Sequence, residues 1–179
     1  QIIWNRPKYV KNSPNYYYDQ LTEFNGGKAR LVKGYTTDNY TDWAIEFING
    51  KGRADQQQPW YLWLCYGAVH GPFTPADRHK GDYKAAKVPV PKDVYPPRPG
   101  KPKYVQKMEH WEPKNGVPVE KKVRELGPVG MKDIPGRPLR DWIRQYHEGV
   151  RAIDEGVGRV LQALKDSGQD EDTLIVFTS

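Results

Sequence analysis

The sequence predicts an α/β fold, in which part of a sheet is flanked by helices and interrupted by a long proline-rich insertion. Three observations support this prediction. An uninterrupted apolar run spans 60–66, a long amphipathic stretch spans 139–165, and a second apolar run at 174–177 follows that stretch. Continuous apolar runs are typical of strands buried on both faces, and a helix followed by such a strand is half of a parallel crossover unit.

The composition favours an ordered domain. The 179 residues suffice for one domain with a core, and the aromatic content of 12% is too high for a disordered chain. No apolar stretch reaches the roughly 18 residues of a membrane span, and no signal peptide opens the chain. The single cysteine, Cys65, excludes an internal disulfide. Gln1 is no initiator methionine, and the chain stops inside an apolar run, so we expect a fragment.

Short elements are expected before the first apolar run. Residues 16–24 and 28–33 flank Asn-Gly-Gly and predict a hairpin, whereas 1–15 has no clear period. A helix should follow, with Thr36 or Thr37 as its cap and Gly50 at its end. Its apolar face should comprise Tyr40, Trp43, Ala44, Phe47 and Ile48.

The segment 71–138 is basic and rich in proline. It holds 13 of the 16 prolines, and between Asp77 and Arg140 there are 16 Lys or Arg against 8 Asp or Glu. We expect a long, extended insertion, because its proline-rich stretches favour polyproline-like chain. Structureless loops of this length are uncommon in compact domains and are usually functional or disordered. A basic loop beside a site would attract anions, and a solvated surface loop is the simpler alternative.

The helix expected at 139–165 contains three glycines, Gly149, Gly156 and Gly158. Each glycine lowers helix propensity by about 1 kcal/mol where it is exposed. Glycine is tolerated in a helix where another backbone packs closely, so this helix should lie against the sheet. Gly168 should end it.

His70 is the candidate catalytic residue. It follows the run at 60–66, and open α/β sheets bind ligands beyond the carboxyl ends of their strands. The alternative is a hydrogen-bonded histidine at a strand end. Arg78 and Lys80 follow closely and are candidates for contacting an anionic substrate. The remaining histidines are expected on loops or helix surfaces, and these are His79, His110 and His147.

Three blocks of sequence carry a family resemblance. The first is Gly-Tyr-Thr-Thr-Asp at 34–38 with the helix to Ile48, and the second is 59–66 running into Val-His-Gly-Pro-Phe at 69–73. The third is 146–161 with Asp-Thr-Leu-Ile-Val-Phe-Thr-Ser at 172–179. In this order they resemble an internal segment of the sulfatase family, within the alkaline-phosphatase-like superfamily. The resemblance implies that 1–179 is part of a single catalytic domain, with 71–138 as its variable insertion.

The resemblance implies hydrolysis of sulfate esters, on sulfated carbohydrates or aryl sulfates. It assigns His70 to contact the sulfate and to protonate the leaving alcohol. The family also uses a calcium ion and a formylglycine made within Cys/Ser-x-Pro-x-Arg, a motif that is absent here and does not fit Cys65. Its metal ligands are likewise expected outside this chain, so the chain alone should be inactive. The family further implies export, to the periplasm or the exterior.

Two other functions stay open. A phosphoester or phosphonate hydrolase of the same superfamily would share these blocks, and the nucleophile upstream would distinguish it. A non-enzymatic polyanion-binding module would explain the basic insertion. No nucleic-acid-binding motif is present, and the aromatic residues are expected in the core, so we expect no nucleic-acid partner.

Overall fold

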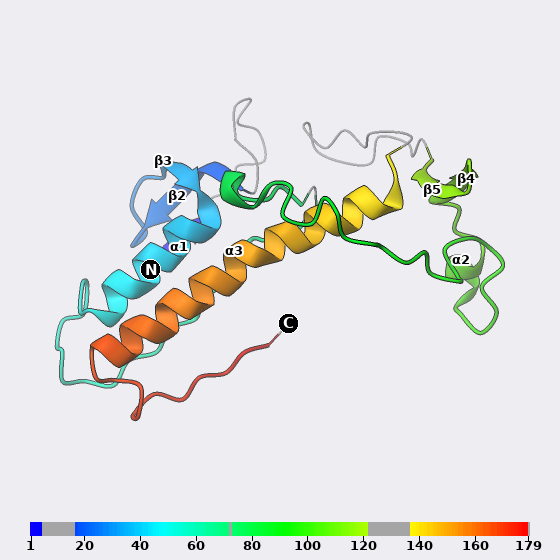
Figure 1. The fold of residues 1–179 in the computed structure, drawn as a ribbon. Coiled ribbons are helices and arrows are strands. Elements are labelled where there is room, and N and C mark those ends of the chain that lie inside the picture. Colours follow the sequence, from blue (N-terminus) through cyan, green and yellow to red (C-terminus); the bar gives the residue numbers. More distant parts are fainter. Residues whose placement is uncertain (5–16, 72, 122–136, 179) are drawn as a thin grey trace. The chain divides into compact units, whose positions relative to one another are not determined.

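The computed structural model describes residues 1–4, 17–71, 73–121 and 137–178 (Figure 1). The chain forms two compact units, one of residues 1–70 with 149–179 and the other of 71–148. Each unit is described by itself below. The predictions for 5–16 and 122–136 lie outside the described residues, and the single catalytic domain stays a prediction.

The first unit opens with a three-stranded antiparallel sheet of β1 (Ile2–Trp4), β2 (Tyr18–Phe24) and β3 (Arg30–Tyr35), in that order. The turn between β2 and β3 has positive φ at Asn25 (53°) and Gly26 (74°), conformations that asparagine and glycine tolerate best. The predicted hairpin is therefore confirmed. Strand β1 was not predicted, because three residues are too few to show a period.

Helix α1 (Thr36–Ile48) follows β3 directly. The predicted threonine cap is wrong, because Tyr35 occupies the N-cap position and no side chain caps the helix. Thr36 lies inside the helix, and its backbone N–H donates to the carbonyl of Tyr17 at 2.8 Å. The predicted end is confirmed, since Gly50 has a φ of 95° and its N–H donates to the carbonyl of Phe47.

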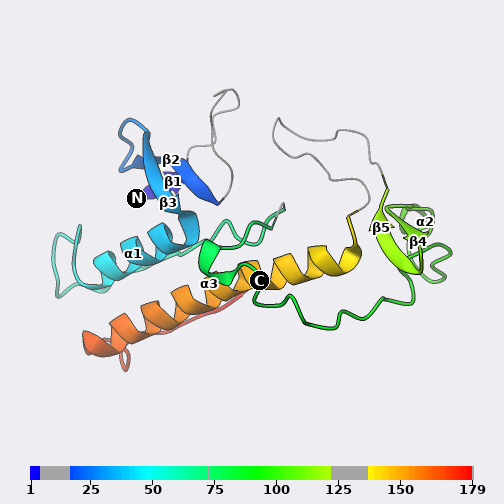
Figure 2. The same cartoon turned by 45° about the horizontal axis from the view of Figure 1, so that its top comes forward.

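Helix α3 (Leu139–Asp166) matches the long helix that the sequence predicts. Its residues from Gly149 onward belong to the first unit, where α1 lies beside them (Figures 1 and 2). The two helices share a small core of Ile48, Ala163 and Leu164, with Ile45, Trp60 and Val160 packed around it. Gln169, just past α3, closes this core by accepting from Trp60 Nε1 at 2.9 Å and donating to the carbonyl of Ile48 at 3.1 Å.

Two of the three α3 glycines lie where another segment packs closely. A Cβ added at Gly149 would lie 2.9 Å from Val69 Cγ1, and one at Gly156 would lie 2.5 Å from Thr41 Oγ1. Gly158 has no neighbour within 4 Å of such an atom. Close packing is therefore found at Gly149 and Gly156, but against side chains and not against the backbone that the sequence predicts. The neighbours are α1 and the loop before His70, not a sheet.

The two predicted buried strands, 60–66 and 174–177, are wrong. Both segments are irregular, and Tyr61 and Trp63 are about 80% exposed. Leu174 is 89% exposed, and the three residues after it are also exposed. Within the described residues, no backbone hydrogen bond reaches either segment from another strand. The strands that the structure describes pair with one another, in antiparallel fashion. Neither apolar run therefore has a neighbouring strand among them to which its backbone can hydrogen-bond.

The second unit is not the plain extended loop that the sequence predicts. It contains a short 3-10 helix, η1 (Asp77–His79), the helix α2 (Lys103–Gln106), and an antiparallel hairpin of β4 (Trp111–Lys114) and β5 (Val117–Glu120). The buried guanidinium of Arg98 organises the chain before the hairpin. It donates to four backbone carbonyls, those of Asp93, Val94, Val105 and Met108, at 2.6–2.8 Å. The segment thus folds around a cation bound to neutral acceptors.

Substituting the α3 glycines tests this packing. Gly156→Ala should lower the free energy of unfolding by about 1–2 kcal/mol, because overpacking outweighs the gain in helix propensity. Gly158→Ala is the matched control on the same helix, and it should raise stability by up to about 1 kcal/mol, since its added methyl group meets no neighbour. Urea denaturation of the purified protein measures both changes. Equal effects of the two substitutions would contradict the close packing at Gly156.

Candidate active-site turn and basic pocket

His70 ends a turn that follows the extended segment 59–66. Its backbone N–H donates to the carbonyl of Gly67 at 3.2 Å, which closes the turn, and the residue is exposed. An exposed imidazole on a turn is accessible to a ligand. The turn has no regular strand before it, so its position depends on contacts with other elements of the unit.

Tyr17 provides one of these contacts. Its side chain is fully buried, and its hydroxyl donates a hydrogen bond to the carbonyl of His70. The Tyr17 ring stacks on Tyr35 with ring centres 6.1 Å apart, and its own carbonyl accepts from Thr36. Tyr17 therefore links the His70 turn to the sheet and to the start of α1.

Helix α3 and helix α1 provide the other contacts. Val69 packs against Gly149 of α3, directly before His70. Tyr66 lies against Gly156, and its hydroxyl shares a 2.9 Å hydrogen bond with Thr41 Oγ1 of α1. Burial raises the pKa of the Tyr66 phenol, so it stays a neutral hydrogen-bonding group at physiological pH. The segment that carries His70 is thus held by α1 and α3 through Tyr66 and Val69, and by Tyr17 through the His70 carbonyl.

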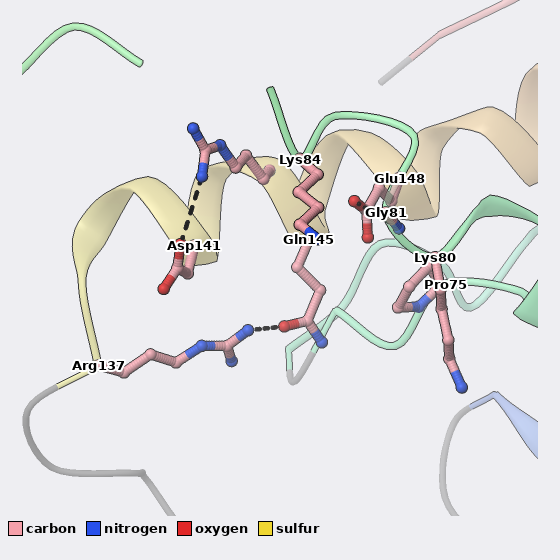
Figure 3. Close-up of a pocket in the computed structure, with 9 residues that line it drawn as sticks. Pro75, Lys80, Gly81, Lys84, Arg137, Asp141, Gln145 and Glu148 are labelled. Carbon is pink, nitrogen blue, oxygen red and sulfur yellow. Dashed lines mark hydrogen bonds and ion pairs between the residues drawn. The ribbon is translucent and has the colours of Figure 1, made fainter. Parts of the chain in front are cut away.

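The second unit holds a pocket of about 360 Å³ (Figure 3). Its lining is dominated by charged side chains. The lining residues are Pro75, Lys80, Gly81, Lys84, Arg137, Asp141, Arg144, Gln145 and Glu148. Four of these side chains are cationic and two are carboxylates, so the lining has a net positive charge.

The hairpin β4–β5 positions the arginine at the start of α3. The backbone N–H of Glu120 donates to the carbonyl of Arg137 at 3.0 Å, and the buried Glu120 carboxylate accepts from Trp142 Nε1 at 3.1 Å. The Arg137 guanidinium lies over the Trp142 ring, 4.7 Å from its centre. Its own N–H donates to Gln145 (Figure 3). The aromatic face and the amide orient this cation without neutralising it.

The residues that the sequence singled out belong to two different compact units. Lys80 lines the basic pocket and pairs with Asp77 at 2.5 Å, whereas Arg78 is exposed on η1 and is not among the lining residues. His70 belongs to the other compact unit. Among the described residues, the structure does not bring His70, Arg78 and Lys80 together as one cluster within a unit.

The remaining histidines are partly as expected. His147 is exposed on α3, which confirms its prediction. His110 is partly exposed, and its Nε2 lies 3.2 Å from the Glu120 carboxylate. The prediction for His79 is wrong, because its ring is buried and its Nδ1 lies 3.0 Å from Asp82. Asp82, which supplies this contact, lies in the turn directly after η1.

No metal site is found within the described ranges, because none of their His, Cys, Asp and Glu side chains gather in a group of three or more. Calcium sites are usually built around several carboxylates, and the described residues contain no such cluster. None of the described helices combines the length and apolar character needed to cross a lipid bilayer.

Several contributors were not identified from the sequence. Tyr17 lies 53 residues before His70, and no local pattern indicates their contact. The pocket residues of α3 did leave a signal, since Asp141, Arg144, Gln145 and Glu148 recur at helical spacing on one face. Lys84 left none, because it lies in a turn within a segment rich in lysine.

Comparisons with known proteins cover nearly the whole chain. The model of the family described as Sulfatase matches residues 3–179. The chain is 27% identical to an N-acetylglucosamine-6-O-sulfatase of Bacteroides thetaiotaomicron, over 91% of the chain and 36% of that protein. It is 25% identical to an uncharacterized sulfatase, YdeN, of Escherichia coli, over 91% of the chain and 20% of that protein.

Two further matches are informative. The multifunctional alkaline phosphatase superfamily protein PehA of Trinickia caryophylli is 25% identical over 84% of the chain and 28% of its own length. A solved structure in complex with its substrate, D-glucosamine-2-N,6-O-disulfate, aligns with a TM-score of 0.64 at 20% identity, over 88% of this chain and 39% of that one. This likeness shows the fold. The chain spans between a fifth and two fifths of these proteins.

Tyr17→Phe tests the anchoring of the turn. Loss of the hydroxyl leaves the His70 carbonyl without this donor, so the free energy of unfolding should fall by about 1 kcal/mol. The amide of His70 should also exchange its hydrogen faster, as measured by mass spectrometry. Tyr40→Phe is the control, because the Tyr40 hydroxyl donates to Gln20 instead, at 2.8 Å. Equal exchange at His70 in the two variants would contradict the anchoring role.

Proposed function

The chain belongs to the sulfatase family, and from that premise we propose that its parent protein hydrolyses sulfate esters, with His70 as the catalytic acid. The observation that carries the proposal is the family match over residues 3–179, which includes the histidine at the end of the 59–70 segment. The chain covers about a third of its N-acetylglucosamine-6-O-sulfatase relative. The reaction is therefore assigned to the parent protein, and the chain alone should be inactive.

The proposed role of His70 follows from the chemistry of sulfate esters. When a nucleophile forms a bond to sulfur, the bond from sulfur to the ester oxygen breaks and negative charge develops on the leaving alcohol. A protonated imidazole beside that oxygen donates its proton and stabilises the charge. Histidine suits this role because its ordinary pKa lies near neutrality.

The position of the turn supports this role. The imidazole is exposed, while the His70 carbonyl is bound by the buried Tyr17 and the neighbouring Val69 packs on α3. The fixed backbone limits the positions that the imidazole can reach, while the exposure of the residue leaves it accessible to a substrate. Preorganisation of this kind lowers the cost of placing the acid in the transition state.

A sulfated carbohydrate is the proposed substrate, and Arg78 and Lys80 are proposed to contact it. One relative is an N-acetylglucosamine-6-O-sulfatase, and the solved relative was bound to D-glucosamine-2-N,6-O-disulfate. Both side chains are exposed cations, and Lys80 lines the basic pocket. Aryl sulfates serve as the simplest artificial substrates.

Formylglycine and calcium enter the proposal only as properties of the family. The described residues do not form a cation site, and Cys65 does not lie in the formylglycine motif. No step above depends on either group. We propose that other parts of the parent protein provide both, and that the protein acts in the periplasm or outside the cell, which cell fractionation would test.

A phosphoester or phosphonate hydrolase is the second candidate. The observation that favours it is the similarity to PehA, which is named as a multifunctional alkaline phosphatase superfamily protein. Matched 4-nitrophenyl sulfate, phosphate and phenylphosphonate esters distinguish the candidates by their kcat/KM values. A preference for the phosphorus esters would replace the sulfatase proposal.

His70→Ala tests the catalytic role. Loss of a general acid should lower kcat about 100- to 10,000-fold on a sugar sulfate, whose alkoxide is a poor leaving group. The loss should be much smaller on 4-nitrophenyl sulfate, because a phenolate leaves without a proton. His147→Ala, which removes an exposed histidine of α3, is the control and should retain activity. Equal losses on both substrates would refute the acid role of His70.

A further inference from the structure

We propose that the basic pocket of the second unit binds a sulfate group of a sulfated glycan, in addition to the ester group on which His70 is proposed to act. The pocket is lined by Lys80, Lys84, Arg137 and Arg144, with Asp141 and Glu148 among them (Figure 3). The glycan as ligand class rests on the proposed function. The anion site rests on the charges and contacts of the pocket itself.

The two carboxylates of the pocket already have partners. Glu148 Oε1 accepts the backbone N–H of Gly81 at 3.0 Å, and the Glu148 side chain is buried. Asp141 lies 3.7 Å from Arg144 Nη1 and 3.8 Å from Arg140 Nε. Lys80 pairs with Asp77 at 2.5 Å, so the surplus of positive charge in the lining rests mainly on Lys84 and Arg137, beside the partly paired Arg144.

The arginines are held mainly by neutral groups. Arg144 donates from Nε and Nη2 to the carbonyl of Ala86, at 3.2 and 2.5 Å. Arg137 donates to the amide of Gln145 and lies over the Trp142 ring. Carbonyls, amides and aromatic faces orient a guanidinium without cancelling its charge. The two cations are therefore preorganised for an anion.

Lys84 adds an adaptable cation at the same pocket. No described residue forms an ion pair with its exposed ammonium group. Its backbone is nevertheless fixed, because the Lys84 N–H donates to the carbonyl of Gly81 at 3.0 Å, and Gly81 in turn donates to Glu148. A fixed backbone with a flexible ammonium group lets the side chain follow a sulfate that enters the pocket.

The size and lining of the pocket favour a glycan sulfate over a nucleotide phosphate. A volume of about 360 Å³ accommodates a sugar unit with its sulfate group. The lining holds no aromatic ring, so a nucleobase would have no surface on which to stack. A sulfate ester presents three terminal oxygens and one negative charge, which matches several separate N–H donors.

Charge substitutions of opposite sign test this site in the full-length protein. Lys84→Glu should weaken binding of a sulfated glucosamine-containing tetrasaccharide about tenfold, because it replaces an attraction by a repulsion. Glu148→Gln should strengthen binding about two- to threefold, because it removes a negative charge while its amide oxygen still accepts from Gly81. Isothermal titration calorimetry at low salt measures both affinities.

Lys92→Glu is the matched control, since it makes the same change of charge on an exposed lysine outside the pocket. Its affinity should stay within about twofold of the parent protein, because distant exposed charges are screened. The desulfated tetrasaccharide, which retains its carboxylates, should bind weakly to every variant. Equal effects of Lys84→Glu and Lys92→Glu, or equal binding of the desulfated chain, would overturn the proposal. All titrations use the His70→Ala background, in which turnover is suppressed, so a failure of the sulfatase assignment would leave this result interpretable.

Discussion

The approach of the 66–70 segment to helix α3 depends on two glycines. At Gly149 and Gly156 the helix has no side chain, and Val69 and the Tyr66 hydroxyl occupy the space that a methyl group would fill. This contact brings the turn to the helix, and the Tyr17 hydroxyl then binds the turn from the side of the sheet. A histidine without a strand before it is thereby held as firmly as one at the end of a strand.

Local patterns predicted the helices and the hairpin, because helical spacing and turn residues depend on neighbours in the sequence. They failed for 60–66 and 174–177, where burial depends on pairing with distant strands. The contact between Tyr17 and His70 was invisible for the same reason. Of the candidate site residues, His70 and Lys80 were named from the sequence. Lys84 was not, because its place in the pocket depends on the turn at Gly81, which is bound by the distant Glu148.

In the second unit, arginine side chains donate hydrogen bonds to backbone carbonyls. The buried Arg98 donates its four hydrogen bonds to backbone carbonyls. Arg144 likewise donates to a backbone carbonyl, that of Ala86. A carbonyl orients a guanidinium and leaves its charge in place, and Arg144 also has the Asp141 carboxylate 3.7 Å from its Nη1. The fold of the segment therefore depends on arginines that donate to backbone carbonyls.

The exposed run at 174–177 affects how the chain behaves during synthesis and handling. Leucine, isoleucine, valine and phenylalanine stand in succession there, with all four side chains exposed. An extended apolar segment with unsatisfied backbone groups is a template for pairing with an identical segment of another molecule. Until a neighbouring strand covers it, this run should promote aggregation. The dependence of the protein on chaperones would then come from the exposed run at 174–177, rather than from the basic insertion.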